Sequence, residues 1–465
     1  MDNNNITLEN KKNIHFIGIG GISMSGLAEI LIHAGKCVSG SDANESKITN
    51  HLASLGAKIY FGHNEENISK DVDLVVYTAA ISEDNPEYVK AKEYNIPCIA
   101  RATLLGLIMK QYKTAIGVSG THGKTTTTSM IADILLAANT DPTVMVGGIL
   151  GSIGGNIRIG ESSNFITEAC EYTNSFLSFY PTIGIILNVS EDHMDFFKDI
   201  DDIRNSFRKY CELIPADGTL IINADIPDYK YFTEGLPCEI ITFGSKESGA
   251  DMYAENVTFD ELARGEYDLM IKGEKVSRIK LSVTGMHNVM NSLSAIACAL
   301  TMKLEMDDIK KGLASCIGSE RRFQKKGEVN GITVIDDYAH HPDEITATLM
   351  TAKNYPHKNT WCVFQPHTYT RTKAFLKEFA QSLSLADKVV LTDIYAAREK
   401  NTIGISSLDL LEELKKLNVE AYYFGSFEEI KKFLLEKCIN GDLLITMGAG
   451  NVVNIANELV ATVAK

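Results

Sequence analysis

The chain has 465 residues, of which 45% are hydrophobic and 23% charged, an ordinary composition for a globular protein of two to four domains. Its formal net charge of −15 argues against a nucleic-acid-binding surface, and no apolar run approaches the roughly 20 residues that would cross a membrane. Nine cysteines without a C-x-x-C pair indicate reduced thiols in a cytosol, and the polar residues after Met1 predict no signal peptide.

A glycine-rich turn follows the first expected strand, residues 13–17. The turn, residues 18–26, precedes a helix expected over 27–34, and a second strand ends at Asp42. A strict dinucleotide fingerprint would need glycine at Ser23, so the turn favours another nucleotide or a phosphate group, with NAD or a purely structural turn as alternatives. Three further strands complete a first α/β domain, and we expect them at residues 58–61, 74–78 and 97–99.

A second glycine loop connects an apolar strand ending at Val118 to a helix expected over residues 129–136. Strand, glycine loop, Lys-Thr and helix is the layout of a nucleotide-phosphate cradle, in which Lys124 reaches the β- and γ-phosphates and the Thr125 hydroxyl holds Mg²⁺. Val118 replaces the first glycine of the usual pattern, so a plain strand-to-helix turn is the alternative. Two such loops predict an enzyme that uses a nucleoside triphosphate and holds a second phosphorylated molecule.

Two strands of the central region end in polar residues. One delivers Glu168 into a loop, and the next ends in a segment with Asn188 and His193. The carboxyl ends of strands in open α/β sheets carry ligand groups, so these side chains are candidates for binding Mg²⁺ or, for the imidazole, for acting through water. Asp192 and Asp195 beside the histidine favour a functional role over a capping one.

The remaining central residues give weaker signals. We expect the glycine pairs at 147–148 and 154–155 to mark mobile loops, and residues 217–280 to form short, β-rich segments. A helix is expected to start near Gly285. The polar residues near its start are His287, Asn288 and Asn291. Amide side chains can read the edge of a base, but on spacing alone a helix cap followed by ordinary polar helix positions is the favoured explanation.

The last third of the chain predicts a Rossmann-like sheet whose strands carry polar or glycine-rich loops at one edge. Their concentration there favours a substrate-binding face over scattered surface residues. The loops follow Ile335, Phe364, Leu391 and Met447.

Taken together, these motifs resemble the Mur ligases of bacterial cell-wall synthesis along nearly the whole chain. The first loop is most similar to that of the alanine-adding branch. The matching segments occur in the family's order at 16–26, 120–125, 168–171, 188–195, 287–291, 321–323, 337–342 and 367–372. The resemblance implies an α/β fold of three domains: a Rossmann-like amino-terminal domain for the UDP-substrate (1–110), a central P-loop ATPase-type domain (111–322) and a Rossmann-like carboxyl-terminal domain for the amino acid (323–465).

The same resemblance implies ligation of L-alanine to UDP-N-acetylmuramate in the cytoplasm, with ATP and Mg²⁺, through an acyl phosphate, with no nucleic-acid or membrane partner and a monomeric or dimeric state. The implied catalytic residues are Lys124, His193, His340 and Arg371. The implied metal ligands are Thr125, Glu168 and His193. The implied ATP-binding residues are Gly120, Thr121, His122, Gly123, Lys124, Thr125, Thr126, His287, Asn288, Asn291, Arg322 and Asp337. The implied substrate-binding residues are Gly18, Gly20, Gly21, Ser25, Asp42, His63, Tyr338, His340 and Arg371.

Two departures from the family pattern concern the supporting ligand of a second metal, which they leave unassigned, and the clamp for the alanine carboxylate, which then rests more on Arg371. Sister ligases carry a carbamylated lysine where this chain has Asn205-Ser206-Phe207, and some members of the branch have arginine where Thr368 stands. The nearest alternative is a ligase that returns a recycled tripeptide to UDP-N-acetylmuramate. An NAD-dependent oxidoreductase would leave Lys124 unexplained, and a non-catalytic UDP-sugar sensor would not need the residues implied in catalysis.

Overall fold

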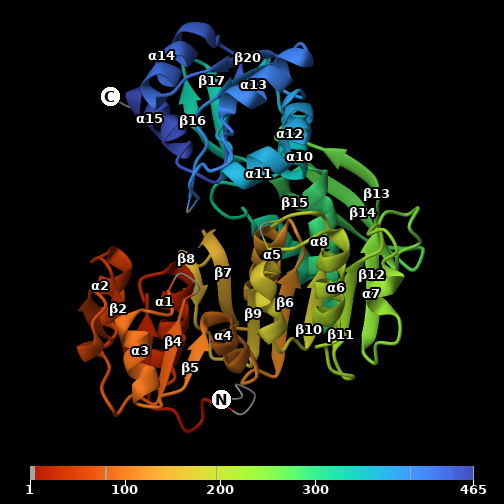
Figure 1. The fold of residues 1–465 in the computed structure, drawn as a ribbon. Helices are drawn as coiled ribbons and strands as arrows, with labels where there is room; N and C mark the ends of the chain where they lie inside the picture. Colours follow the sequence, from red (N-terminus) through yellow and green to blue (C-terminus); the bar gives the residue numbers. More distant parts are fainter. Residues whose placement is uncertain (1–5, 79–80, 195, 398, 464–465) are drawn as a thin grey trace. The chain divides into compact units, whose positions relative to one another are not determined.

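A computed structural model describes residues 6–78, 81–194, 196–397 and 399–463 (Figure 1). Contacts divide the chain into two compact units. Unit 1 comprises Met1–Ser190, Ile200–Phe243 and Ser294–Gly312, and unit 2 comprises Glu191–Asp199, Gly244–Leu293 and Leu313–Lys465. Within the described residues, no helix combines the length and the apolar character needed to cross a membrane.

Unit 1 begins with five parallel strands in the order β3-β2-β1-β4-β5, which is the Rossmann-like order expected for this region. Its elements are β1 (Asn13–Ile17), α1 (Ile22–His33), β2 (Cys37–Asp42), α2 (Lys47–Ser54), β3 (Lys58–Phe61), the short 3₁₀ helix η2 (Glu65–Asn67), β4 (Leu74–Tyr77), α3 (Pro86–Glu93), β5 (Cys98–Ala100) and α4 (Arg101–Met109). Helix α1 starts at Ile22 rather than at the expected Leu27, so Ser25 belongs to the helix and the turn is confined to Gly18–Gly21.

The second sheet of unit 1 contains the strand that leads into the phosphate-type loop. Strands β12, β11, β10, β6, β9 and β7 lie side by side in parallel, and β8 adds an antiparallel edge. The elements are β6 (Thr114–Ser119), α5 (Lys124–Ala137), β7 (Thr143–Leu150), β8 (Gly155–Arg158), β9 (Asn164–Glu168), η3 (Tyr172–Ser178), β10 (Ile183–Ile186), α6 (Ile200–Cys211), β11 (Thr219–Asn223), α7 (Lys230–Thr233) and β12 (Glu239–Gly244). Strand β10 is buried throughout, as a parallel strand covered on both faces should be.

The expected mobile loops at the two glycine pairs are largely wrong. Gly147 and Gly148 lie inside β7, and Gly155 starts β8, so that the two strands form a hairpin with its turn at residues 151–154. The reason is local packing, because a Cβ on Gly147 would lie 3.2 Å from a carboxylate oxygen of Glu168. The glycine therefore permits close approach of a side chain rather than mobility.

Helix α9 (Met306–Ser315) completes unit 1 with its first turns. A Cβ on Gly312 would lie 2.4 Å from the Cα atom of Ile134 on α5, so the two helices touch backbone to backbone at this point. This contact joins residues that are far apart in the sequence.

Unit 2 contains a three-stranded antiparallel sheet and a six-stranded, mainly parallel sheet. The antiparallel strands are β13 (Met252–Phe259), β14 (Arg264–Ile271) and β15 (Glu274–Thr284), followed by α8 (Met286–Thr301). The larger sheet has the order β16-β17-β21-β18-β19-β20, in which only the β16–β17 pair is antiparallel among the described strands. Its elements are β16 (Gln324–Val329), β17 (Ile332–Asp337), α10 (Pro342–Ala352), β18 (Thr360–Phe364), α11 (Tyr369–Ala374), α12 (Leu376–Leu383), β19 (Lys388–Leu391), α13 (Ser407–Lys416), β20 (Glu420–Tyr423), α14 (Phe427–Lys437), β21 (Leu443–Met447) and α15 (Val453–Val463).

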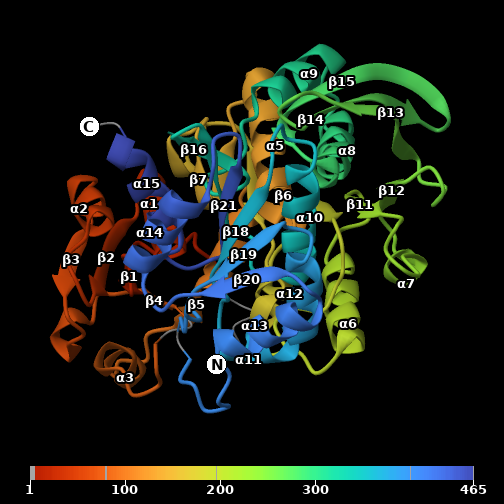
Figure 2. The same ribbon diagram turned by 90° about the horizontal axis from the view of Figure 1, so that it is seen from above.

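Helices cover both faces of this larger sheet. One core cluster joins the sheet to α10, α12 and α13, and the other joins it to α14 and α15 (Figure 2). Strands β17, β18, β19 and β21 are parallel, so their carboxyl ends meet at one edge, which confirms the expected face of polar loops.

Candidate functional site

The loop between β6 and α5 has the geometry of an anion-binding turn. Gly123 caps the helix with a φ of 87°, a conformation that favours glycine, and Lys124 is the first residue of α5. The unpaired N–H groups at the start of a helix face outward along its axis and attract negative charge. The loop therefore offers a binding place for phosphate at the end of a buried strand.

Two side chains fasten this loop to the segment after β10. The Asn188 side chain accepts a hydrogen bond from the His122 N–H at 2.8 Å and donates one to the His122 carbonyl at 3.0 Å. The Thr121 hydroxyl accepts the Ser190 N–H at 2.9 Å. These contacts fix the loop's backbone, which is what a preorganised binding turn requires.

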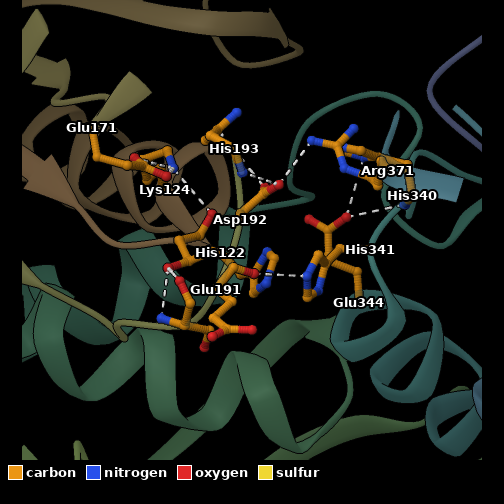
Figure 3. Close-up of polar contacts among 12 residues, drawn as sticks. His122, Lys124, Glu171, Glu191, Asp192, His193, His340, His341, Glu344 and Arg371 are labelled. Carbon is orange, nitrogen blue, oxygen red and sulfur yellow. Dashed lines mark hydrogen bonds and ion pairs between the residues drawn. The ribbon is translucent and has the colours of Figure 1, made fainter. Parts of the chain in front are cut away.

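Lys124 is held inside its own loop (Figure 3). Its Nζ atom lies 2.9 Å from Glu171 Oε2 and donates to the carbonyl oxygens of Gly120 at 2.5 Å and Thr121 at 3.1 Å. Burial by itself would lower the pKa of Lys124, but the adjacent carboxylates, Glu171 foremost, outweigh it and raise the pKa above its ordinary value. The lysine is therefore a permanently charged group beside the phosphate-binding backbone.

Thr125 and Glu168, both in unit 1, offer oxygen ligands suited to Mg²⁺. The Thr125 hydroxyl makes no hydrogen bond to any residue that the structure describes, and Glu168 accepts the Gly147 N–H at 2.8 Å with one carboxylate oxygen. A half-buried carboxylate and an available hydroxyl fit this hard cation. Thr126, the next residue of α5, is buried.

The glycine turn after β1 is shaped by Asp42. Its carboxylate accepts the Gly20 N–H at 2.8 Å, and a Cβ on Gly20 would lie 2.8 Å from the same oxygen. Gly18 has a φ of 82°, and Gly21 is the residue that caps α1. Asp42 thus holds the turn by hydrogen bonding, while its predicted contact with uridine remains a prediction.

Two other residues expected near the UDP-substrate have structural partners. Ser25 is buried, and its hydroxyl donates to the Ile22 carbonyl at 2.9 Å within α1. His63 lies after β3, where its Nδ1 atom is 3.1 Å from Glu87 Oε2 and 3.0 Å from the Ser41 hydroxyl. Its side chain is 26% exposed, so one part of the ring faces outward.

In unit 2, the segment Glu191–Asp199 is joined by an ion pair to α11, the helix that follows β18. Arg371 Nη2 lies 2.9 Å from Asp192 Oδ1, and both side chains are nearly buried. The same carboxylate oxygen accepts a hydrogen bond from the backbone N–H of His193 at 2.7 Å, and the second oxygen lies 3.8 Å from His193 Nε2 (Figure 3). Burial would raise the pKa of Asp192, but Arg371 and His193 hold it far below its usual range. Asp195 lies outside the described residues.

His340 and Arg371 belong to one polar cluster at the carboxyl ends of β17 and β18. His340 Nδ1 is 3.2 Å from Glu344 Oε2, and its ring meets the His367 ring edge to face with centroids 5.6 Å apart. His367 Nδ1 lies 3.2 Å from Arg371 Nη1. Burial lowers the pKa of His340 to about 4; Glu344 opposes this shift and Arg371 adds to it. The imidazole is therefore neutral near pH 7 and able to accept a proton. Beside it, the Tyr338 ring packs edge to face at 5.5 Å.

Asp337 and Arg322 are engaged with neighbouring residues of unit 2. Asp337 is buried and accepts the N–H groups of Phe323 at 2.7 Å and Ala339 at 2.8 Å. Burial raises its pKa to about 6, against the opposing effects of Arg322 and these two N–H groups. Arg322 Nη1 is 3.4 Å from Glu344 Oε1. Asp337 thus orders the turn before β16, Arg322 pairs with a residue of α10, and the expected contact of both with ATP remains a prediction.

The three residues at the start of α8 separate into two kinds. His287 is exposed, whereas Asn288 and Asn291 are buried. Asn288 donates to the Thr284 carbonyl at 2.8 Å and accepts from Asn291 at 2.9 Å. These bonds fit the capping alternative, and adenine recognition by the three residues remains a prediction.

Sequence reasoning left several interacting side chains without a role. Some carried a signal, because Glu171 follows Glu168 by three residues and Glu344 follows His340 by one helical turn. The others depend on contacts between distant segments, which spacing alone does not reveal. The residues concerned are Glu87, Glu171, Asp192, His341, Glu344 and His367.

Three family models match the chain. They are the Mur ligase family catalytic domain at residues 13–113, the Mur ligase middle domain at 118–299 and the Mur ligase glutamate ligase domain at 321–450. Similar curated proteins include the UDP-N-acetylmuramate–L-alanine ligases of Lachnospira eligens, 58% identical over 98% of this chain and 99% of that protein, and of Agathobacter rectalis, 59% identical over 96% and 97%.

Solved structures agree with these matches over the full length. The crystal structure of UDP-N-acetylmuramate-alanine ligase MurC from Thermotoga maritima has a TM-score of 0.80 at 31% identity and covers 98% of this chain and 99% of that one. A murein peptide ligase from Psychrobacter arcticus has a TM-score of 0.69 at 25% identity, with the same coverage. The three-domain α/β architecture expected from the sequence is thereby confirmed, and the chain belongs to the Mur ligase family.

Proposed function

We propose that the protein is an ATP-dependent ligase that joins L-alanine to UDP-N-acetylmuramate in the synthesis of peptidoglycan precursors. The observation that carries the proposal is similarity over nearly the whole chain, at 58–59% identity, to relatives named for this reaction. The charged Lys124 in a rigid phosphate-type loop supports it independently. We assign residues 1–110 to the UDP-substrate, 111–322 to ATP and 323–465 to the amino acid, and we expect the enzyme to work in the cytoplasm.

The chemistry explains why a phosphate loop belongs in an amide ligase. A carboxylate does not react with an amine at neutral pH, because its oxygen is a poor leaving group. Attack of the substrate carboxylate on the γ-phosphate gives an acyl phosphate and ADP, and the amine of alanine then displaces phosphate. Two anions must meet in the first step, so Lys124 and the helix N-terminus contribute by neutralising charge. Mg²⁺ would neutralise more of the phosphate charge when bound, with Thr125 and Glu168 of unit 1 as its ligands, and His193 of unit 2 is a separate candidate ligand.

The amino-acid step is assigned to the cluster at the edge of the larger sheet. Arg371 would bind the alanine carboxylate, for which it must exchange its present partner Asp192. The neutral imidazole of His340 would accept the proton that the amine loses. Tyr338 would pack beside the reacting groups.

Phosphate release tests the proposal most directly. We expect release with ATP, Mg²⁺ and UDP-N-acetylmuramate when L-alanine is the amino acid, and much less when other amino acids are added one at a time. The tripeptide that a recycling ligase would use is included as a separate arm. Turnover with the tripeptide but not with L-alanine would replace the proposal by that alternative.

A further inference from the structure

Glu87 is a completely buried carboxylate of unit 1 to which the proposed reaction assigns no role. It lies in the first turn of α3, and each of its oxygens faces polar side chains from other elements. Oε2 accepts the Ser41 hydroxyl of β2 at 2.6 Å and lies 3.1 Å from His63 Nδ1. Oε1 accepts the amide of Asn67 in η2 at 2.5 Å and lies 3.7 Å from Nε2 of His15 in β1.

These contacts keep Glu87 ionised. Burial would raise the pKa of its carboxyl, but the adjacent His15 ring and the hydrogen bonds from Ser41 and Asn67 together lower it below the ordinary value. An ionised carboxylate can only accept hydrogen bonds. Among the described residues, the partners of the Glu87 carboxylate are hydroxyl, amide and imidazole groups, and Lys90 of the same helix is paired with Glu65 and Glu93 at 3.0 and 3.1 Å.

The negative charge of Glu87 determines which atoms of Ser41 and His63 carry a proton. The Ser41 hydroxyl gives its hydrogen to Glu87, so its oxygen is left to accept, 3.0 Å from His63 Nδ1. Both groups beside Nδ1 are acceptors, so Nδ1 must carry the proton. In a neutral imidazole the other nitrogen, Nε2, then presents a lone pair. No residue within the described ranges hydrogen-bonds to that nitrogen, and the ring is partly exposed.

The cluster is joined directly to the glycine turn. The Ser41 carbonyl accepts the N–H groups of Gly18 and Ile19, each at 2.9 Å, and the next residue, Asp42, holds Gly20. On the opposite side, His15 Nδ1 bonds the Ser39 hydroxyl at 2.9 Å, and its ring lies 6.1 Å from that of Tyr60. His63 is thus connected to the turn through Ser41 on its Nδ1 side, while its ring is partly exposed.

We propose that Glu87 is a positioning residue that fixes His63 as a hydrogen-bond acceptor for a donor of the uridine group, either the imide N–H of uracil or a ribose hydroxyl. The inference rests on the proposed binding of the UDP-substrate by residues 1–110. The inference specifies the tautomer of His63 and the direction of its hydrogen bond, because a ring with its proton on Nδ1 accepts through Nε2 and does not donate to phosphate.

Nitrogen-15 NMR of the histidine-labelled full-length protein tests the tautomer without substrate and without a variant of Glu87. The His63 signals are assigned by their loss in His63→Gln. We expect a protonated Nδ1 and an unprotonated Nε2 near pH 7.5, and the same state with a shifted Nε2 resonance after UDP-N-acetylmuramate is added. A proton on Nε2 in the free protein, or a doubly protonated ring in the complex, would overturn the proposal.

Steady-state kinetics test the consequence. In Glu87→Gln the amide NH₂ must face one of the donors, so we expect the KM for UDP-N-acetylmuramate to rise roughly tenfold, while kcat and the KM values for ATP and L-alanine change less than about twofold. Glu93→Gln, the same change on an exposed residue of the same helix, is the matched control and should leave all four constants unchanged. A folded Glu87→Gln enzyme with an unaltered KM would count against the assignment.

Substrate analogues separate the two donors. N3-methylation of the uracil removes the imide N–H, and a 2′- or 3′-deoxyribose removes a hydroxyl. We expect one of these changes to weaken binding to the wild-type protein about tenfold and to have little further effect in His63→Gln. If none of the analogues discriminates, the proposal is wrong. If calorimetry detects no binding of UDP-N-acetylmuramate to the wild-type protein at all, the proposed function fails instead. The NMR test of the tautomer in the free protein does not depend on that binding.

Discussion

Lys124 offers the sharpest test at the scale of a single residue. Replacing it by alanine removes the charge that would face the phosphates, so we expect phosphate release to fall by about 10³-fold. Binding of UDP-N-acetylmuramate, measured by calorimetry, should survive because we assign it to residues 1–110. Lys124→Arg retains the charge beside Glu171 and serves as the control for folding. Equal loss of binding and turnover in Lys124→Ala would contradict the assignment of two separate binding places.

His340 predicts a specific pH dependence of stability. Its pKa in the folded protein is about 4, below the ordinary histidine value of about 6.5. Between these values the unfolded chain binds more protons than the folded one, so the free energy of unfolding falls as the pH is lowered through this window. At pH 5 the loss attributable to this residue is about 2 kcal/mol.

Urea unfolding at pH 7 and pH 5 measures this effect. His340→Gln cannot titrate, so the stability that the variant loses between the two pH values should be smaller by the amount attributed to the imidazole. Since burial of the ring causes the shift, an identical loss in variant and wild type would show that His340 is protonated well above pH 4.

The individual site residues could be predicted to different degrees from the sequence. Lys124 and Thr125 were identifiable because a local pattern of glycines and flanking elements determines their surroundings. Asp192 was not, because its partner Arg371 is 179 residues away and no pattern relates the two segments. Glu171 shows an intermediate case. It was visible beside Glu168, but the choice of which carboxylate faces the lysine depends on how the chain leaves β9.

At the scale of elements, the contact between β7 and β9 yields a prediction about metal dependence. In Gly147→Ala the new methyl group meets the Glu168 carboxylate at about the 3.2 Å of the ideal Cβ position, so the carboxylate must move. If Glu168 binds Mg²⁺, the Mg²⁺ concentration for half-maximal phosphate release should rise roughly tenfold.

Gly155→Ala is the matched control for this change. Gly155 lies in the neighbouring strand β8, where the nearest atom to an added Cβ is 3.9 Å away, an ordinary contact distance. Its Mg²⁺ dependence should equal that of the wild type. Unchanged Mg²⁺ dependence in Gly147→Ala would remove Glu168 from the set of metal ligands.

Elements with strong periodic or apolar patterns were predictable, and elements defined by glycine were not. Strands β18 and β21 end at the predicted residues, Phe364 and Met447, because each is a mainly apolar run that is buried throughout. In β7 the glycines suggested a loop, since sequence alone does not distinguish a glycine that makes the backbone flexible from one that makes room for a neighbouring side chain. Helix α1 begins earlier than expected for a related reason, since Ser25 and Gly26 near its start are buried.

The whole molecule predicts a simple pattern of thiol reactivity. None of the nine cysteines, all of which lie in the described residues, forms a disulfide; seven are buried, whereas Cys37 is exposed and Cys170 is partly buried. Burial also raises the pKa of Cys170, which slows its reaction. We expect one thiol to react rapidly with an aromatic disulfide reagent in the native protein, none to do so in Cys37→Ser, and all nine to react after unfolding. Several rapid thiols in the native protein would contradict the described core.

The backbone contact between Gly312 and Ile134 has a consequence for how the protein is made. Unit 1 is assembled from three separate stretches of sequence, and its last part, near Gly312, leaves the ribosome long after the phosphate-type loop. At roughly 5–20 residues per second, the interval between Ile134 and Gly312 corresponds to about 10–40 seconds of synthesis. During that time the surface of α5 around Ile134 lacks the neighbour that covers it in the folded protein.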